Sequence, residues 1–261
     1  MKRAARLMAL AGVSAGLVFS MCGCRSSGGT PQNETQQPQT KWKPHVAMTT
    51  VENAIAMPDA DREDSVVVTV ARDEQVFLGS DQTNLSDLSS RVRGMLAYKA
   101  DKEVYIREDM RARFREIGDV IDSLRAADVE YVGLLVLRKN ADPQQGYRQF
   151  PQYSTGLGLI VLSPSMLKEH LPKRIPESMD RVTILRGPTG APVYKINRTE
   201  VQKAELLPRL TEMYKNRAER VLFIRADDDF WFAYVAEVMD IAKGADVDHV
   251  AVITPQMAAG H

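Results

Sequence analysis

The chain has 261 residues, which is enough for one large domain or two small ones. Its 34 basic and 34 acidic side chains give a formal net charge of zero, which argues against bulk electrostatic binding of nucleic acid. Both cysteines lie near the N-terminus, so a disulfide framework is excluded for the rest of the chain.

Residues 1–24 predict a signal peptide. Three basic residues precede the uncharged apolar run 7–21, which is shorter than the about 20 residues of a spanning helix. A small residue before a cysteine resembles the bacterial lipobox, so we expect lipid modification at Cys24, or at Cys22. An uncleaved signal anchor is the alternative. Both alternatives attach the chain to a membrane and place the rest on the periplasmic side of the cell envelope.

Residues 25–60 are predicted to form a tether, because residues 25–44 are mostly Ser, Gly, Thr, Gln, Asn and Pro and cannot bury enough apolar surface to fold. The first module then covers residues 61–138. Apolar runs and helical spacing predict strands at 66–70 and 76–78, a helix from about residue 85, a strand at 104–106, a helix starting at Asp109, and a strand at 132–137.

Residues 139–178 form an insert or linker, in which only the apolar stretch 157–162 reads as a strand, with a short helix capped by Ser163 or Ser165 after it. The second module covers residues 179–257. Its predicted elements are strands at 182–185 and 193–196, a helix through Leu206 and Leu210, a strand at 222–224, a helix from about Asp227, and a strand at 250–253.

The two modules share a sequence pattern at a constant offset of 224 − 106 = 118 residues. Ile106-Arg107-Glu108-Asp109 corresponds to Ile224-Arg225-Ala226-Asp227, and Phe114 corresponds to Phe232. The predicted fold is therefore α/β (α+β), with two tandem ββαβαβ two-layer modules. Each copy is near the lower size limit for a self-sufficient core, so we expect an intramolecular pseudo-dimer or a homodimer.

One module pattern is distinctive. It has an apolar strand ending in carboxylates (104–109), an aromatic residue (Phe114), a Val-x-Asp helix (120–122) and a final aliphatic strand (132–136). This pattern resembles the periplasmic domain of the ExbD/TolR family. The stretch Met57-Pro58-Asp59-Ala60 is similar to the one that follows the family's membrane helix.

The resemblance implies a protein without enzymatic activity or cofactor. It implies an ExbB/TolQ-like channel protein and a TonB/TolA-like protein as partners, and peptidoglycan as a ligand of TolR-type domains. The family's membrane helix carries a proton-binding aspartate, whereas the apolar run 7–21 has no acidic residue. Because proton relay needs an intramembrane carboxylate, we do not expect this chain to conduct protons.

Five positions are candidates for a structural or binding role. Asp109 and Asp227 lie at matched positions, where we expect helix caps. Arg107 and Arg225 precede them and, with Trp231, form a candidate binding face. The alternatives are solvent-exposed arginines and a tryptophan packed in the core.

Asp122 and Asp240 are expected to be exposed.

The four histidines are scattered without metal-ligand spacing, and no serine or cysteine lies in a nucleophile elbow, so no catalytic, cofactor or metal site is predicted.

Two functions remain open at this point. The first is a non-enzymatic accessory or coupling component of a transport system driven by the proton-motive force. The alternative is a peptidoglycan-binding structural lipoprotein without a motor partner. An enzyme with its site in the insert has no support in the residue types. Nothing in the sequence decides between the inner and the outer membrane.

Overall fold

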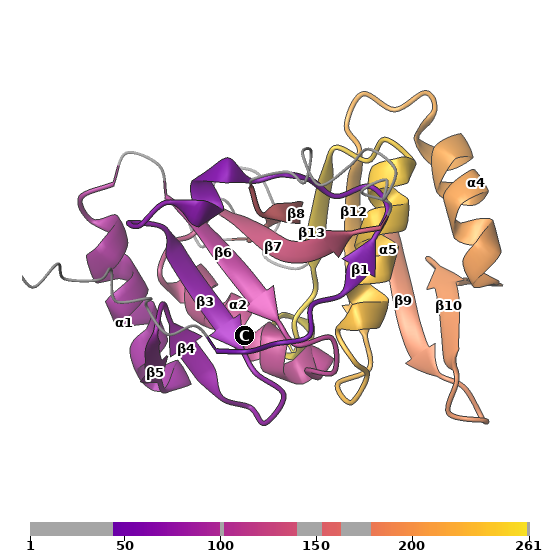
Figure 1. Ribbon diagram of the computed structural model, residues 1–261. Helices are drawn as coiled ribbons and strands as arrows, with labels where there is room; N and C mark the ends of the chain where they lie inside the picture. Colours follow the sequence, from indigo (N-terminus) through magenta and orange to yellow (C-terminus); the bar gives the residue numbers. More distant parts are fainter. Residues whose placement is uncertain (1–43, 100–101, 140–152, 163–178, 260–261) are drawn as a thin grey trace, which may run out of the picture. The chain divides into compact units, whose positions relative to one another are not determined.

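The computed structural model describes residues 44–99, 102–139, 153–162 and 179–259 (Figure 1). The signal segment with Cys22 and Cys24, the tether up to residue 43, and the short helix predicted near Ser163 lie outside these residues. We call residues 44–61 the strap, residues 66–138 the first half and residues 181–252 the second half.

The first half has three strands before its first helix. Its elements are β3 (Val66–Val70), β4 (Val76–Leu78), β5 (Asp81–Thr83), α1 (Leu85–Leu96), β6 (Glu103–Glu108), α2 (Phe114–Ala126) and β7 (Tyr131–Arg138). β3 consists of β-branched residues, which suit a buried strand. The strands and helices predicted from apolar spacing are therefore present, and β5 is an addition that its polar residues did not signal.

The second half has the same order of elements. They are β9 (Arg181–Arg186), β10 (Pro192–Ile196), β11 (Thr199–Val201), α4 (Lys203–Tyr214), β12 (Val221–Ala226), α5 (Ala233–Gly244) and β13 (His249–Val252). Outside the halves lie β1 (Thr50–Val51), β2 (Ile55–Ala56) and the 3-10 helix η1 (Pro58–Asp61) in the strap, β8 (Thr155–Ile160) in the insert, and α6 (Pro255–Ala259).

The offset of 118 residues recurs in the structure. β6 and β12 have bounds that differ by that number at both ends, and α1 and α4 do as well. Two pairs of left-handed turn residues also correspond: Asp128 and Asp246 have φ of 63° and 56°, and Gly79 and Asn197 have φ of 65° and 55°. Left-handed backbone is uncommon outside glycine, so its recurrence at matched positions reflects the same local geometry in both halves.

All described strands join in a 13-stranded sheet. Eleven follow the order β11-β10-β9-β12-β13-β8-β7-β6-β3-β4-β5, with β1 paired to β7 and β2 paired to β8. Strands β3, β6 and β7 are parallel, as are β9, β12 and β13. β8 is antiparallel to β7 and parallel to β13, so the two parallel sets run in opposite directions. A twofold axis perpendicular to the sheet would produce this arrangement.

Helices α1, α2, α4 and α5 pack on one face of the sheet. Their apolar residues share one buried cluster with alternate strand residues such as Ile106, Val132, Ile224 and Val250. On the opposite face, the strap covers the first half through Ala60 and Met57, which pack with Tyr105 and Leu135. A separate cluster of Leu162, Phe223, Ala251 and Ile253 lies on that face of the second half.

The structure corrects two predicted boundaries. Residues 44–60 were expected to belong to the tether, but they carry β1, β2 and η1 and bury Val51 and Ala54 in the main core. The polar composition that predicted a tether applies only to the segment before them. The second correction concerns the helices after Asp109 and Asp227, which begin at Phe114 and Ala233.

Candidate functional site

The loops that precede α2 and α5 meet in a symmetric contact between the halves. Phe114 N donates to Phe230 O at 2.7 Å, and Phe232 N donates to Ala112 O at 2.7 Å. The two bonds are equivalent under the repeat offset, since 114 + 118 = 232 for the donors and 112 + 118 = 230 for the acceptors. Arg113 and Trp231 form the antiparallel bridge between them and are equivalent to each other. The two halves therefore meet about a local twofold axis at this bridge.

Phe114 and Phe232 complete this contact from the core side. Their rings stack with centroids 6.3 Å apart and an interplanar angle of 10°. Both side chains are fully buried, with 1% and 0% exposure. Each ring therefore packs on its own equivalent at the local axis.

A second contact between the halves comes from the two aspartates predicted to be exposed, and that prediction is wrong. Asp122 and Asp240 are 6% and 9% exposed. On α2, Asp122 accepts a hydrogen bond from Thr254 Oγ1 at 2.9 Å and pairs with Arg125 at 3.0 Å. Thr254 follows the last strand of the second half, so a helix of the first half holds a segment of the other half.

On α5, Asp240 holds the strap. Its carboxylate accepts the backbone N–H groups of Glu52 and Asn53 at 3.1 and 2.6 Å, and Asn53 Nδ2 donates to its carbonyl at 3.1 Å. Bonds from backbone N–H groups to a carboxylate are among the stronger hydrogen bonds in proteins. The strap thus joins the second half to the first, where β1 pairs with β7.

Asp109 and Asp227 do not cap helices, contrary to prediction. The residues at the N-cap positions of α2 and α5 are Arg113 and Phe232. Instead, each aspartate closes the turn after its strand, with its C=O accepting the N–H three residues later. The Asp109 carboxylate accepts Ala47 N of the strap at 3.1 Å, and the Asp227 carboxylate accepts Arg186 N at 2.6 Å.

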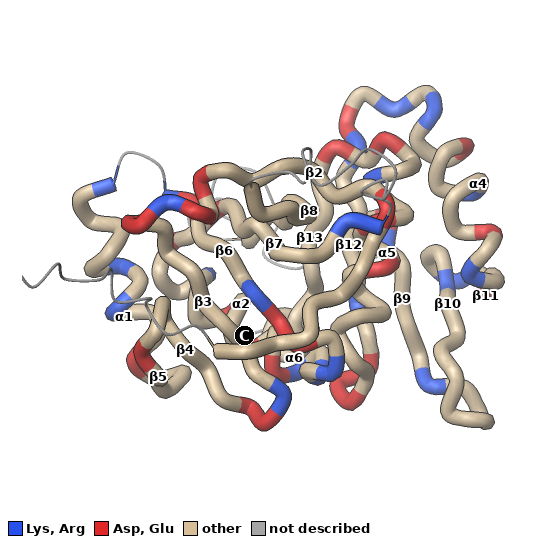
Figure 2. Tube along the Cα trace, in the orientation of Figure 1, with Lys and Arg blue, Asp and Glu red and all other residues tan. Residues whose placement is uncertain are grey.

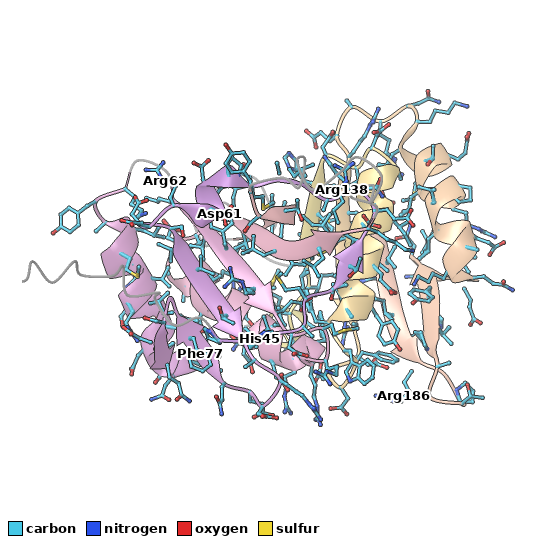
Figure 3. The ribbon with its side chains drawn as sticks, in the orientation of Figure 1. His45, Asp61, Arg62, Phe77, Arg138 and Arg186 are labelled. Carbon is cyan, nitrogen blue, oxygen red and sulfur yellow. The ribbon has the colours of Figure 1, made fainter. Side chains whose placement is uncertain are left out.

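The bonds to Asp109 lower the pKa of its carboxyl group. Burial acts in the opposite direction, but the N–H groups of Ala47 and Arg111 and the Arg111 guanidinium favour the charged form. The carboxylate therefore stays ionised while it holds the start of the strap, which Figure 3 marks at His45.

The candidate binding face does not come together as one surface. Arg107 on β6 and Arg225 on β12 lie on the sheet face opposite the helices, since they alternate with Ile106 and Ile224 of the main core. Arg107 is half-buried, and burial lowers its pKa. Trp231 is 49% exposed and lies at the bridge between the halves, before α5. Figure 2 shows acidic and basic residues distributed over both halves.

A cavity of about 230 Å³ lies at the seam between the halves. It is lined by residues of the strap, β7, β8, α5 and β13, including Met57, Tyr131, Gly158, Lys243 and His249. The Met57 side chain lies in a notch formed by two glycines: a Cβ on Gly133 or Gly156 would approach its sulfur to 2.8 or 2.4 Å. These glycines let the strap lie close against β7 and β8.

Glu108 is a further residue that the sequence reasoning missed. It ends β6, is 0% exposed, and accepts a hydrogen bond from Thr49 Oγ1 of the strap at 3.2 Å. Strand alternation could have signalled it, because Val104, Ile106 and Glu108 fall on one side of the strand. Asp122 and Asp240 carried no comparable signal, because their partners are distant in sequence.

Within the described residues, no group of His, Cys, Asp and Glu side chains is arranged to hold a metal ion. The helices of that part of the chain are also all too short or too polar to cross a membrane.

The fold and the symmetric contact define a two-layer α/β protein built from two similar halves. Residues 29–139 match the family model of the biopolymer transport protein ExbD/TolR. The chain therefore carries an ExbD/TolR region that includes the strap and the first half, and the predicted resemblance is confirmed there. A search of the curated proteins finds no match.

Members of the ExbD/TolR family are non-enzymatic, membrane-anchored accessory proteins of energised transport, with a periplasmic domain. They typically work with ExbB/TolQ and TonB/TolA proteins. The matched region ends one residue after β7 and so does not extend to β8 or the second half.

Proposed function

We propose that this chain is a non-enzymatic envelope protein in which two ExbD/TolR-like halves form a pseudo-dimer within one chain. The family match supports this for the first half. For the second half, the support is the shared order of elements and the pair of equivalent hydrogen bonds at Arg113 and Trp231. That symmetric contact is the observation that carries the proposal.

The pseudo-dimer predicts a monomer in solution. Size-exclusion chromatography with light scattering on the full chain in detergent should give the mass of one chain. A Phe232→Ala variant should loosen the contact without producing a stable dimer. A stable dimer of the unaltered chain would contradict the proposal.

In the envelope, we infer a role as an accessory or coupling component of a transport system driven by the proton-motive force. Photo-crosslinking from Arg225 and from Trp231 in living cells tests this role, with mass spectrometry of the captured proteins. Capture of an ExbB/TolQ-like or TonB/TolA-like protein is the expected result. Retention on purified sacculi without any such protein would instead favour the peptidoglycan-binding alternative.

The proposed membrane attachment is a lipid on Cys24. Globomycin should block processing of the unaltered chain, and Cys24→Ala should abolish lipid labelling while Cys22→Ala leaves it intact. The reverse pattern would assign the lipid to Cys22. Processing that neither globomycin nor either substitution changes would remove the lipoprotein proposal, and the absence of any processed form would support the uncleaved signal anchor.

A further inference from the structure

Glu108 is an acidic side chain enclosed at the point where the strap meets the first half. Its registered neighbour on β3 is Val70, which belongs to the main apolar core. Its Oε1 atom accepts the Thr49 hydroxyl, and its Oε2 atom has no hydrogen-bond partner among the described residues. A buried carboxylate with a single hydroxyl donor is poorly compensated, so the neutral acid is the form that fits this site.

The adjacent Asp109 carboxylate also disfavours the charged form of Glu108. Arg111 pairs with Asp109 at 3.2 Å. Burial raises the pKa of Glu108 to about 8; the Thr49 hydroxyl opposes the shift, and the Asp109 charge adds to it. The equivalent position in the second half is Ala226, so the first half alone has this buried acid at its strand end.

The strap that covers Glu108 is held by few backbone bonds. It pairs with β7 over two residues and with β8 over two residues. Two further backbone bonds hold the strap, from Met110 N to Ala47 O at 2.6 Å and from Met57 N to Ser154 O at 2.7 Å. Side-chain contacts to residues 47–53 include the carboxyl groups of Glu108, Asp109 and Asp240. Thr49 lies between the bonds to Asp109 and Asp240, so detachment of this part of the strap brings water to Glu108.

We propose that attachment of the strap is linked to proton binding. In the seated state the strap covers a protonated Glu108, and in the released state it has detached and this carboxyl group ionises. The inference rests on the contacts of the strap alone, so it does not depend on the partners proposed above.

The direction of the pH dependence follows from the raised pKa. The seated state holds a proton up to about pH 8, whereas the released state loses it near the ordinary value of 4.5. The stabilisation of the seated strap is complete below pH 4.5 and decreases as the pH rises to about 8. Within that window the equilibrium constant for release increases about tenfold per pH unit.

The protonation of Glu108 can be measured directly. Side-chain ¹³C NMR of the full chain in detergent, labelled on glutamate, should show one carboxyl group that titrates near pH 8. That signal should be missing in Glu108→Gln and should titrate higher in Thr49→Val, which removes the donor that favours the charged form. If every glutamate titrates in the ordinary range, the proposal is wrong.

The coupling to the strap needs a second measurement. Hydrogen exchange of the Ala47, Glu52 and Asn53 amides, divided by their intrinsic rates, reports release between pH 5.5 and 8.5. We expect a rise of about tenfold per pH unit up to about pH 8, and a levelling off above it, in the unaltered chain and in the control Glu200→Gln, an exposed acid on β11.

In Glu108→Gln the corrected exchange should be nearly independent of pH. The same slope in this variant and in the unaltered chain would overturn the proposal. Should Glu108→Gln fail to fold, two values in the unaltered chain still decide the outcome: the pH at which the carboxyl group titrates and the pH at which strap exchange levels off must agree.

Discussion

The two halves use equivalent aspartates for different tasks. Asp122 on α2 binds Thr254, a side-chain hydroxyl that follows the second half, while Asp240 on α5 binds two backbone N–H groups of the strap. In both cases the helix of one half holds a segment next to the other half in sequence, since the strap precedes the first half and Thr254 follows the second. The equivalent positions are thus both buried, although the chemistry of the partner differs.

The strand ends differ more. Glu108 in the first half has Ala226 as its counterpart, and only the first half has the strap over that position in the described residues. The comparison suggests that features near the local axis are shared, whereas features that involve the strap and the insert belong to one half. Four sets of substitutions test this division, in order of decreasing expected effect.

The largest effect is expected at the stacked rings. Phe114→Ala and Phe232→Ala should each lower the free energy of unfolding by about 3–5 kcal/mol, because both side chains are buried. Because the two rings stack on each other, the double variant should lose less stability than the sum of the two single losses. The difference, measured by denaturant titration, should be about 0.5–1.5 kcal/mol. Phe223 is buried in another cluster, so Phe223→Ala is the control. Its loss of stability should simply add to that of Phe114→Ala.

Ala226→Glu should make the second half resemble the first at its strand end. Because Ala226 is 3% exposed, the new carboxyl group should cost about 3 kcal/mol at pH 7. The loss should shrink at pH 5, since a buried acid is more easily accommodated when protonated. Urea midpoints at the two pH values measure this, and Arg225→Glu on the exposed neighbour should be nearly neutral. Equal effects of the two substitutions would contradict the assigned burial.

Asp122→Asn and Asp240→Asn should each cost about 1–3 kcal/mol, because each leaves a buried polar partner poorly paired. The difference between the halves should show in local hydrogen exchange. Asp240→Asn should accelerate the Glu52 and Asn53 amides, and Asp122→Asn should accelerate the amides around Met257, which bonds to Thr254. Identical exchange patterns in the two variants would remove the proposed division of tasks.

The smallest effect is expected for the ion pair across the axis. Arg113 and Asp229 lie 3.5 Å apart with side chains that are 51% and 66% exposed. Asp229→Ala should therefore change the stability by about 0–1 kcal/mol, and less at high salt. A larger loss would mean that the contact depends on its exposed charges as well as on the buried rings.

Most of the strands and helices could be predicted from the sequence because their signals are local. A continuous run of β-branched residues marked β3, and the apolar stripe through Ile117 and Leu124 marked α2. The starts of α2 and α5 could not be placed, because Asp109 and Asp227 are good N-cap residues that the structure uses to close turns after their strands.

The contacts of the candidate site were beyond sequence reasoning for a different reason. The bond from Asn53 to Asp240 joins residues 187 positions apart, and no local pattern indicates such a pair. The strap was assigned to the tether because its two strands have only two residues each, which is too short for a periodic signal. The duplication and the small size of each module predicted pairing, either within the chain or between two chains. They did not indicate a contact through Arg113 and Trp231.

Strand β8 has a consequence for how such a protein could be assembled. It lies between β7 and β13, two equivalent strands from the two halves, where there is room in the sheet for one strand. Two identical chains related by an axis would bring two copies of that strand to a place that accepts one. Joining the halves in a single polypeptide removes this conflict. The segment between the halves is then present once, and it supplies the one strand that fits between β7 and β13.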